Sequence, residues 1–350
     1  MNRIWLRGFC VVVFLVSGLA GTQVLYGQVR NAEVVAFYNL ENLFDTIDTP
    51  DVNDFEFTPE GPKKWNSEKY SAKLGQMALV LAQLGIGYNE DGPSVIGLCE
   101  MENRQVLVDL VNTDVLKNRG YQIIHYDSPD ERGIDVALLY QADKFQPENT
   151  VSAPLVIRDE KGEQILTRDQ LVVSGRLNGE KMHFIVNHWP SRYGGEESSR
   201  PFRKEAALLT RALVDSIMAT ERKAKIVVMG DLNDDPDNES VLKYLKALPD
   251  RSNLEKGALF NATGPLFEKG QGTLIYRGVW NLFDQMIISQ SLLKPKKGQY
   301  YFDSAQIFKE EFLLQQKGKY KGYTWRTYVG NSYHGGFSDH LPAYMVLKKK

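Results

Sequence analysis

Six separated segments of the sequence place amides, carboxylates or histidines beside apolar runs. In chain order they are FYNLEN (37–42), IGLCEMEN (96–103), IVNHWPSR (185–192), IVVMGDLNDD (226–235), WNLFDQM (280–286) and GGFSDHLP (335–342). Mg²⁺ takes oxygen ligands and usually needs one or two protein carboxylates. Histidine can act as a general acid or base, or donate a hydrogen bond to an oxyanion. The six segments therefore predict a shared polar site at the ends of several strands.

Each motif alone has a simpler interpretation. Asn39 is typical of a turn and Glu100 of a helix cap, and a lone histidine at the end of a strand is more often structural. The GDLNDD run is the most informative, because Gly230 permits a sharp exit from an apolar strand. Asp231 and Asn233, two residues apart on an extended turn, can then face the same side. A calcium site or an ordinary acidic turn is the alternative for this run.

The order of the segments resembles the endonuclease/exonuclease/phosphatase superfamily, also called the deoxyribonuclease I-like fold. The matching residues are Asn39, Glu100, Asn187 with His188, Gly230-Asp231-Leu232-Asn233, Asp284 and Ser338-Asp339-His340. The resemblance covers roughly residues 33–347. It implies an α/β fold that is a four-layer sandwich, in which two packed mixed β-sheets are flanked by helices and the active site lies at one end of the sheets.

The resemblance also implies a metal site and a water site. Glu100 would be the chief Mg²⁺ ligand, with Asn39 and Asp339 as further metal ligands and Mn²⁺ able to substitute. Asp231 and Asn233 would position the attacking water and the phosphate. Phosphodiester hydrolysis develops negative charge on the phosphoryl and leaving oxygens, so a cation with amide and imidazole donors suits that chemistry.

Two histidines have catalytic roles by the same resemblance. His340, oriented by Asp284, would serve as a base or a phosphate contact, and His188 would stabilise the phosphoryl charge. Arg168 falls where family members often keep a phosphate-contacting arginine. Asp135 occupies a position that resembles the one orienting His188.

These features predict Mg²⁺-dependent hydrolysis of phosphodiester bonds by in-line attack of an activated water, with a nuclease as the leading activity. A phosphatase or a sphingomyelinase-type phosphodiesterase of the same family is the alternative, acting on a small phosphate ester or a lipid. A non-catalytic binding protein on the same fold is a third hypothesis, although none of the main site residues is missing. A serine-nucleophile mechanism is disfavoured, because no Gly-x-Ser-x-Gly elbow occurs.

The charge distribution gives mixed information about nucleic acid as a partner. The 42 Lys and Arg against 44 Asp and Glu leave a net charge of −2, so no global positive field favours a polyanion. Local basic and aromatic residues at 63–65 and 317–326 could form a surface for nucleic acid. The alternative is a solvated loop with a few core aromatics.

The N-terminus predicts export to the periplasm or the exterior. Arg3 and Arg7 precede an apolar run at 9–19, which is shorter than the roughly 20 residues of a spanning helix, so a signal peptide is expected at 1–27. Its removal would take Cys10 with it and leave Cys99 as a packing residue without a disulfide partner. The absence of repeats and linkers predicts a single domain at 28–350, without a membrane span after cleavage and monomeric.

Apolar periodicity supplies the elements that would position the site. Strands are expected at 33–37, 94–99, 121–125, 136–140, 170–174, 182–187, 225–229, 284–289 and 341–347, with helices at 67–84, 106–116 and 203–218 and a polar insertion at 294–328. The first helix is expected to take Ser67 as its N-cap. Many strands with few helices favour two packed sheets, although periodicity alone does not exclude a doubly wound sheet.

Overall fold

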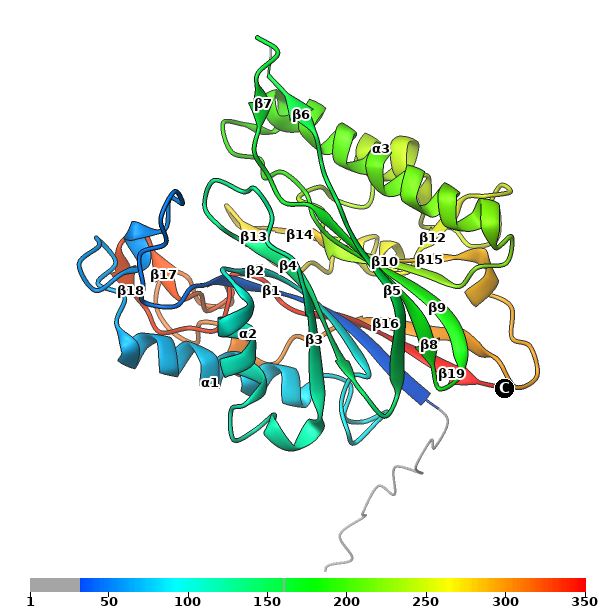
Figure 1. The fold of residues 1–350 in the computed structure, drawn as a ribbon, viewed down its shortest axis with the longest axis horizontal. Coiled ribbons are helices and arrows are strands. Elements are labelled where there is room, and N and C mark those ends of the chain that lie inside the picture. Colours follow the sequence, from blue (N-terminus) through cyan, green and yellow to red (C-terminus); the bar gives the residue numbers. More distant parts are fainter. Residues whose placement is uncertain (1–31, 160) are drawn as a thin grey trace, which may run out of the picture.

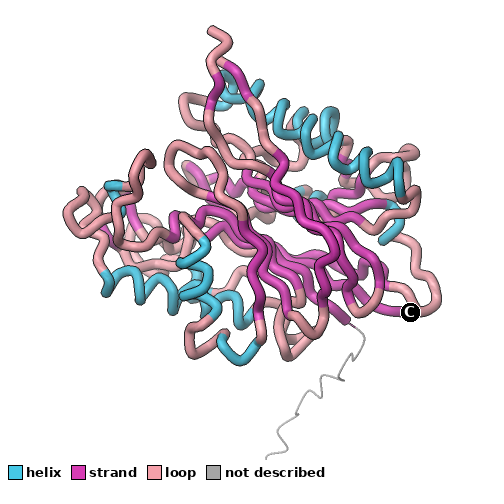
Figure 2. The backbone as a smooth tube through the Cα atoms, viewed as in Figure 1, coloured by secondary structure: helices cyan, strands magenta, loops and turns pink. Residues whose placement is uncertain are grey.

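The computed structural model describes residues 32–159 and 161–350, and two large β-sheets packed face to face dominate it (Figure 1). Helices cover the outer faces of the sheets, as the tube drawing in Figure 2 shows. The predicted four-layer sandwich is therefore confirmed. The predicted signal peptide lies outside the described residues. Among the described residues, no helix is long and apolar enough to cross a membrane.

Thirteen strands form the two large sheets within the described residues. The six-stranded sheet contains β1 (Ala32–Leu43), β2 (Val95–Met101), β3 (Tyr121–His125), β4 (Asp135–Gln141), β16 (Tyr300–Ile307) and β19 (Ala343–Lys349). The seven-stranded sheet contains β5 (Phe145–Ala153), β8 (Gln170–Leu177), β9 (Glu180–His188), β10 (Ile226–Asp231), β11 (Ala247–Leu248), β12 (Leu259–Asn261) and β15 (Asp284–Ser289).

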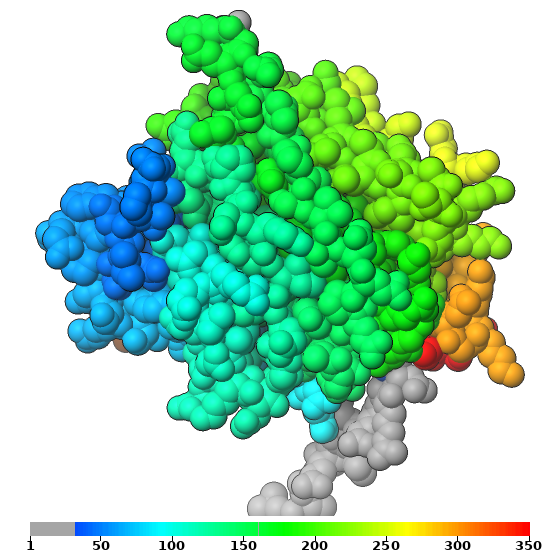
Figure 3. All heavy atoms as spheres, viewed as in Figure 1, coloured from blue at the N-terminus to red at the C-terminus, as the bar shows by residue number. Residues whose placement is uncertain are grey.

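Short hairpins and helices complete the described chain. The hairpins are β6 (Ile157–Arg158) with β7 (Gln164–Ile165), β13 (Leu274–Tyr276) with β14 (Val279–Asn281), and β17 (Tyr328–Val329) with β18 (Ser332–Tyr333). The α-helices are α1 (Ser67–Gln83), α2 (Arg104–Val111), α3 (Glu196–Thr220) and α4 (Gly264–Phe267). In Figure 3 the β6–β7 segment projects at the top, and the loop between β1 and α1 forms a lobe at the left.

The strand directions bring several strand ends to one end of the sandwich. The orders are β16-β19-β1-β2-β4-β3 and β11-β12-β15-β10-β9-β8-β5. Strands β1 and β2 are parallel, as are β9 and β10, so their C-terminal ends meet there. Strands β15 and β19 are antiparallel to β10 and β1, so they begin at that same end. The topology thus gathers the six predicted segments.

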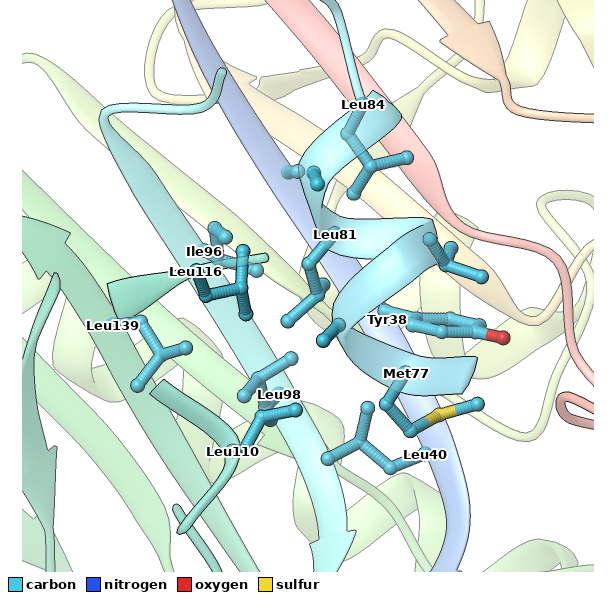
Figure 4. Packing of buried hydrophobic residues seen from close by; sticks show 14 of the residues in the cluster. Tyr38, Leu40, Met77, Leu81, Leu84, Ile96, Leu98, Leu110, Leu116 and Leu139 are labelled. Atoms are coloured by element: carbon cyan, nitrogen blue, oxygen red, sulfur yellow. The ribbon is translucent and has the colours of Figure 1, made fainter. Parts of the chain in front are cut away.

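Side chains alternate between the two faces of each strand, and the apolar ones form three layers, one between the sheets and one on each outer face. In β1, Val35 and Phe37 point between the sheets, where they join Phe184 and Met229 from the other sheet. The opposite face of the six-stranded sheet packs against α1, as Figure 4 shows for Leu81 and its neighbours. Helix α3 covers the outer face of the seven-stranded sheet. Both sheets are therefore packed on both faces, and this packing fixes the positions of the strand ends that carry the site.

The sequence located most elements but misplaced some boundaries. Helix α1 is capped by Asn66, whose side chain accepts from the Lys69 N–H, so the predicted cap at Ser67 is one residue late. Helix α3 begins at Glu196 instead of 203. The segment predicted as an insertion contains β16, which pairs with β19 at the sheet edge. Most side chains of β16 are half-buried on both faces, so the strand has no clear alternation to detect.

Candidate active site

A distortion of two neighbouring strands aims Glu100 into the site. Leu98 packs on the outer, helix-covered side of the sheet, and simple alternation would send Glu100 the same way. Instead Glu100 has φ 59°, and the β2 register shifts between Cys99 and Met101. The β1 register shifts nearby, where Glu41 has φ 49°. Such bulges re-aim side chains, and non-glycine residues hold left-handed backbone at a cost, so both are typical of functional sites.

Asn39 holds two carboxylates together across the sheets. Its Nδ2 donates to Glu100 Oε1 at 3.2 Å and to Asp231 Oδ2 at 3.0 Å. Its Oδ1 accepts from the Glu41 backbone N–H at 2.8 Å, and that bond fixes the orientation of the amide. The expected role of Asn39 as an oxygen ligand does not match this orientation, because the amide presents its NH₂ group to the site.

Two histidines face the same carboxylate, one at the end of β9 and the other in the segment before β19. His340 Nδ1 lies 2.6 Å from Asp284 Oδ2, and its Nε2 lies 3.7 Å from Asp231 Oδ2. His188 Nε2 lies 3.7 Å from both Asp231 Oδ2 and Glu100 Oε1. Its Nδ1 is buried without a hydrogen-bond partner among the residues that the structure describes. Asp231 is therefore the centre on which these side chains converge.

The turn after β10 presents Asn233 beside this centre. Its backbone N–H donates to Asp231 Oδ1 at 2.9 Å, and its Nδ2 donates to the Trp189 carbonyl at 2.9 Å. Asn233 has φ 49°, which asparagine tolerates better than most residues. Asn187 points to the opposite face of its strand, where it accepts a hydrogen bond from Thr210 on α3.

Asp135 does not contact His188. Its Oδ2 lies 2.9 Å from His125 Nε2, and its Oδ1 accepts from the Ser128 backbone N–H at 2.7 Å. The physical reason is strand parity. Along β4, Val136 points between the sheets towards the side of His188, and the preceding residue points to the other face. The predicted orienting role of Asp135 is therefore corrected.

Arg168 is buried close to the site, with its terminal nitrogens engaged. Its Nη1 donates to Asp130 Oδ2 at 3.0 Å and its Nη2 donates to the Trp189 carbonyl at 2.8 Å. It therefore shares the Trp189 carbonyl with Asn233. In this arrangement Arg168 braces the turn after β9.

A network of oppositely charged side chains holds Asp339 in place. Arg326 Nη2 donates to Asp339 Oδ2 at 2.7 Å, and its Nε donates to Glu41 Oε1 at 3.1 Å. Lys73 Nζ, on α1, lies 3.9 Å from Glu41 Oε2 and donates to Thr327 Oγ1 at 2.7 Å. Both Lys73 and Glu41 are buried. Buried charges are costly unless they are paired, so each member of this network depends on the others, and the network connects α1 to Asp339 in the site.

The family model described as "Endonuclease/Exonuclease/phosphatase family" matches residues 34–349. The chain belongs to this family. In the comparison with curated proteins, nothing matches the sequence.

Solved structures of the same fold are similar to the chain at low sequence identity. A humanized TDP2 of D. rerio is 12% identical, with a TM-score of 0.55 and coverage of 91% of this chain and 99% of that one. An endonuclease/exonuclease/phosphatase family protein of Bacteroides thetaiotaomicron is 17% identical, with a TM-score of 0.53 and coverage of 91% and 95%. A mannosyl-6-phosphatase of the same species is 16% identical, with a TM-score of 0.52 and coverage of 90% and 99%.

In this family member the pKa values of the two site histidines are shifted in opposite directions. Burial alone would lower the pKa of His340, but the carboxylates of Asp284 and Asp231 raise it well above its ordinary value. Burial, together with the charge of Arg168, holds the pKa of His188 well below its ordinary value. The surroundings therefore favour the charged form of His340 and the neutral form of His188.

The donor set fits a hard divalent cation. Burial raises the pKa of Asp231 to about 7, and the charges of Asp284 and Glu100 add to that rise. Asn39 Nδ2 donates to both Glu100 and Asp231, so these two carboxylates lie close together. Oxygen-rich sites with crowded carboxylates suit Mg²⁺, whose charge would relieve their repulsion. Glu100 is the carboxylate of this group with the clearer access to solvent, at 14% exposure of its side chain.

Sequence reasoning missed Lys73 and undervalued Glu41. One signal was present, because Lys73 lies four residues before Met77 and therefore on the apolar stripe of α1. The predicted basic surface at 63–65 needs a correction, since Trp65 is fully buried beside Phe57 and Tyr328. It belongs to the core of the lobe between β1 and α1.

Proposed function

We propose that this chain is a metal-dependent hydrolase of phosphodiester bonds, with nucleic acid as its leading substrate. The observation that carries the proposal is the convergence of Asn39, His188 and His340 on the Asp231 carboxylate from both sheets. Donors and acceptors arranged in this way match what phosphoryl transfer needs, namely a positioned water and stabilisation of developing negative charge.

Each side chain has a role that follows from its contacts. Asp231 orients the attacking water, because it is an acceptor held by Asn39 and by the Asn233 N–H. His340, held by Asp284, donates to a phosphoryl oxygen, a role that its raised pKa supports over that of a base. His188 donates to the phosphoryl group as a neutral imidazole.

A divalent cation, Mg²⁺ with Mn²⁺ able to substitute, would be held by Glu100 with Asp339 beside it, and would supply positive charge to the phosphoryl and leaving oxygens. Asn39 and the Asn42 N–H fix the Glu100 carboxylate for that purpose. Arg326 fixes the Asp339 carboxylate. The chain therefore orients its candidate ligands from both sides of the site.

Relatives of the same fold support two substrate classes. One similar structure, 12% identical with a TM-score of 0.54, is D. rerio TDP2 with a single-strand DNA product, and another is the mannosyl-6-phosphatase. A phosphatase is therefore the second candidate, with a sphingomyelinase-type activity behind it. We further propose that the chain is exported and acts as a monomer.

A substrate screen tests the proposed function. Purified protein with Mg²⁺ would be assayed against plasmid DNA, RNA, sphingomyelin, bis-p-nitrophenyl phosphate and a panel of phosphomonoesters, with Asp231→Asn as the inactive control. We expect hydrolysis of diesters over monoesters and nicking of DNA. Turnover of a phosphomonoester or a lipid with nucleic acid untouched would establish the alternative.

A further inference from the structure

We propose that the β13–β14 hairpin and residues 309–326 form one binding surface for single-stranded nucleic acid beside the catalytic site. We call it the hairpin surface. The inference rests on the proposed function, since it names the substrate that this site would take. Apart from Arg326, which orients Asp339, the residues of this surface have none of the catalytic roles described above.

The base of the β13–β14 hairpin is hydrogen-bonded directly to the segments that carry His340 and Asp284. Leu274 forms a β-bridge with His340, and the Leu341 N–H donates to the Thr273 carbonyl at 2.7 Å. The Thr273 hydroxyl oxygen accepts from the Asp284 N–H at 3.2 Å. A strand of nucleic acid bound on the hairpin would therefore lead to the residues that face the scissile phosphate. Figure 1 shows the hairpin at the same end of the sheets as the ends of β1 and β2.

The hairpin tip offers an aromatic ring and a cation to solvent. Tyr276 is 61% exposed, and Val279 beside it is 63% exposed. The Arg277 guanidinium carbon lies 5.2 Å from the Tyr276 ring centroid, and Arg277 is exposed as well. Exposed aromatic rings with nearby arginine are the usual platform on which unpaired bases stack.

Residues 309–326 pack against the hairpin and extend its surface. Lys309 Nζ lies 4.0 Å from the Trp280 ring centroid. The Tyr323 hydroxyl lies against Gly278, because a Cβ atom there would be 3.7 Å from it. Tyr323 also contacts Tyr320 edge to face, with ring centroids 5.4 Å apart. The two segments are therefore continuous, although they are far apart in sequence.

The charge of this surface differs from that of the whole chain. Residues 309–326 contain five basic residues and two acidic ones, whereas the whole chain has a net charge of −2. Lys317, Lys319 and Lys321 are exposed, and Lys319 Nζ lies 5.3 Å from the Tyr320 ring centroid. Far along the same segment, Arg326 reaches Asp339 in the catalytic site. The basic surface thus leads into the site.

This combination selects a single strand over other ligands. A polyanion gains from the lysines through counterion release, which a neutral glycan does not. Stacking on Tyr276 and Tyr320 needs exposed base faces, which a duplex keeps inside its helix. A single-stranded nucleic acid uses both features at once.

Two variants with equal charge change test the assignment. The hairpin-surface variant carries Lys317→Glu, Lys319→Glu and Lys321→Glu, and the control carries Lys294→Glu, Lys296→Glu and Lys297→Glu in an exposed loop at the other end of the sheets. A third variant, Tyr276→Ala, tests stacking. Binding of a fluorescein-labelled oligodeoxynucleotide of about 15 nucleotides is measured in EDTA, and hydrolysis of bis-p-nitrophenyl phosphate is measured with Mg²⁺.

We expect the hairpin-surface variant to bind the oligonucleotide at least about tenfold more weakly, with a salt dependence shallower by about two in log–log slope. Tyr276→Ala should also weaken binding, by about fivefold or more. The control should bind like the wild type, and all variants should hydrolyse bis-p-nitrophenyl phosphate equally. Equal losses in both triple variants, or none in the first, would overturn the assignment.

The two assays separate this inference from the proposed function. If bis-p-nitrophenyl phosphate is hydrolysed but the wild type does not bind the oligonucleotide, the function stands and the hairpin surface is wrong. If the oligonucleotide binds through this surface but no diester is hydrolysed, the surface stands and the proposed function is wrong. Preferential binding of duplex DNA or of a phosphorylated mannan would also overturn it.

Discussion

His340 and Asp284 form a buried pair in which Nδ1 of the ring lies 2.6 Å from Oδ2 of the carboxylate. The pair fixes the imidazole so that Nε2 faces Asp231. A carboxylate in this position holds the ring orientation and stabilises its charged form, as in other histidine–aspartate pairs. The two residues therefore serve one function and should not lose activity independently.

A double-mutant cycle measures that coupling. We expect His340→Ala to lower kcat by at least about a hundredfold, within the range of general acid–base groups. Asp284→Asn should cost a substantial part of that loss, and the double variant should be little worse than His340→Ala alone. Steady-state kinetics on bis-p-nitrophenyl phosphate provide the readout. Strictly additive losses would show that the residues act separately.

The charge of His340 predicts a pH dependence of stability in EDTA. Because its folded pKa is raised above the ordinary value near 6.5, the folded state binds this proton more tightly than the unfolded state. The resulting stabilisation is complete below about pH 6.5 and is lost as pH rises through the folded pKa.

We expect the stability advantage of the wild type over Asp284→Asn to shrink as pH rises, measured by urea unfolding at several pH values. The ¹⁵N shifts of the His340 ring should show a protonated ring above pH 6.5 in the wild type and a lower pKa in Asp284→Asn. A His340 ring that is neutral at pH 6.5 in the metal-free wild type would contradict this prediction.

Sequence order predicted which strand ends meet, but side-chain direction needed the structure. The contact between His340 and Asp284 was expected from the resemblance to the family, and it is present. Glu100 reaches the site through a bulge with left-handed backbone, which no alternation pattern reveals. Asp135 lies at the start of a strand, where a shift of one residue changes the face of the sheet to which a side chain points. Its partner, His125, could therefore not be inferred from motif position.

Long-range pairs account for the rest of the unpredicted site. Glu41 and Arg326 are 285 residues apart, and no local pattern joins them. The position of Lys73 on the apolar stripe of α1 indicated a buried lysine, but nothing in the sequence indicated that Glu41 is its partner. Edge strand β16 lacked alternation because it is half-buried on both faces. In each case the deciding information is a contact between distant segments.

Metal dependence centres on Glu100. Activity should vanish in EDTA and return with Mg²⁺ or Mn²⁺, because the crowded carboxylates of the site need a cation. Glu100→Gln should raise the Mg²⁺ concentration for half-maximal activity by about tenfold or more, since it removes a charged ligand. Glu102→Gln is the matched control, because Glu102 contacts Asp45 and Thr49 instead of the site. Full activity in chelator would refute the metal assignment.

Cys99 should have a packing role alone. It is fully buried between the sheets, and burial raises the pKa of its thiol, so little reactive thiolate forms. We expect Cys99→Ser to keep kcat within about threefold while lowering stability by about 1–2 kcal/mol, because a hydroxyl replaces a thiol in an apolar layer. Iodoacetamide should not label the folded protein. Loss of activity in a folded Cys99→Ser variant would give the thiol a role in the mechanism.

The buried pair of Lys73 and Glu41 should couple stability to the geometry of the site. Burial raises the pKa of Glu41 to about 7 and lowers that of Lys73 to about 8. The folded state thus binds more protons than the unfolded state between pH 4.5 and 7, where stability falls as pH rises. It binds fewer between pH 8 and 10.5, where stability rises.

Removing one partner leaves the other charge buried alone, so we expect Lys73→Met or Glu41→Gln to cost about 3–5 kcal/mol at pH 7.5. The loss of stability in the double variant should be smaller than the sum of the two single losses by about 1–3 kcal/mol, because no lone charge remains. Lys69→Met, one turn earlier on α1, is the control and should cost less than about 1 kcal/mol. Urea unfolding measures all four. Additive losses would show that the two charges do not stabilise each other.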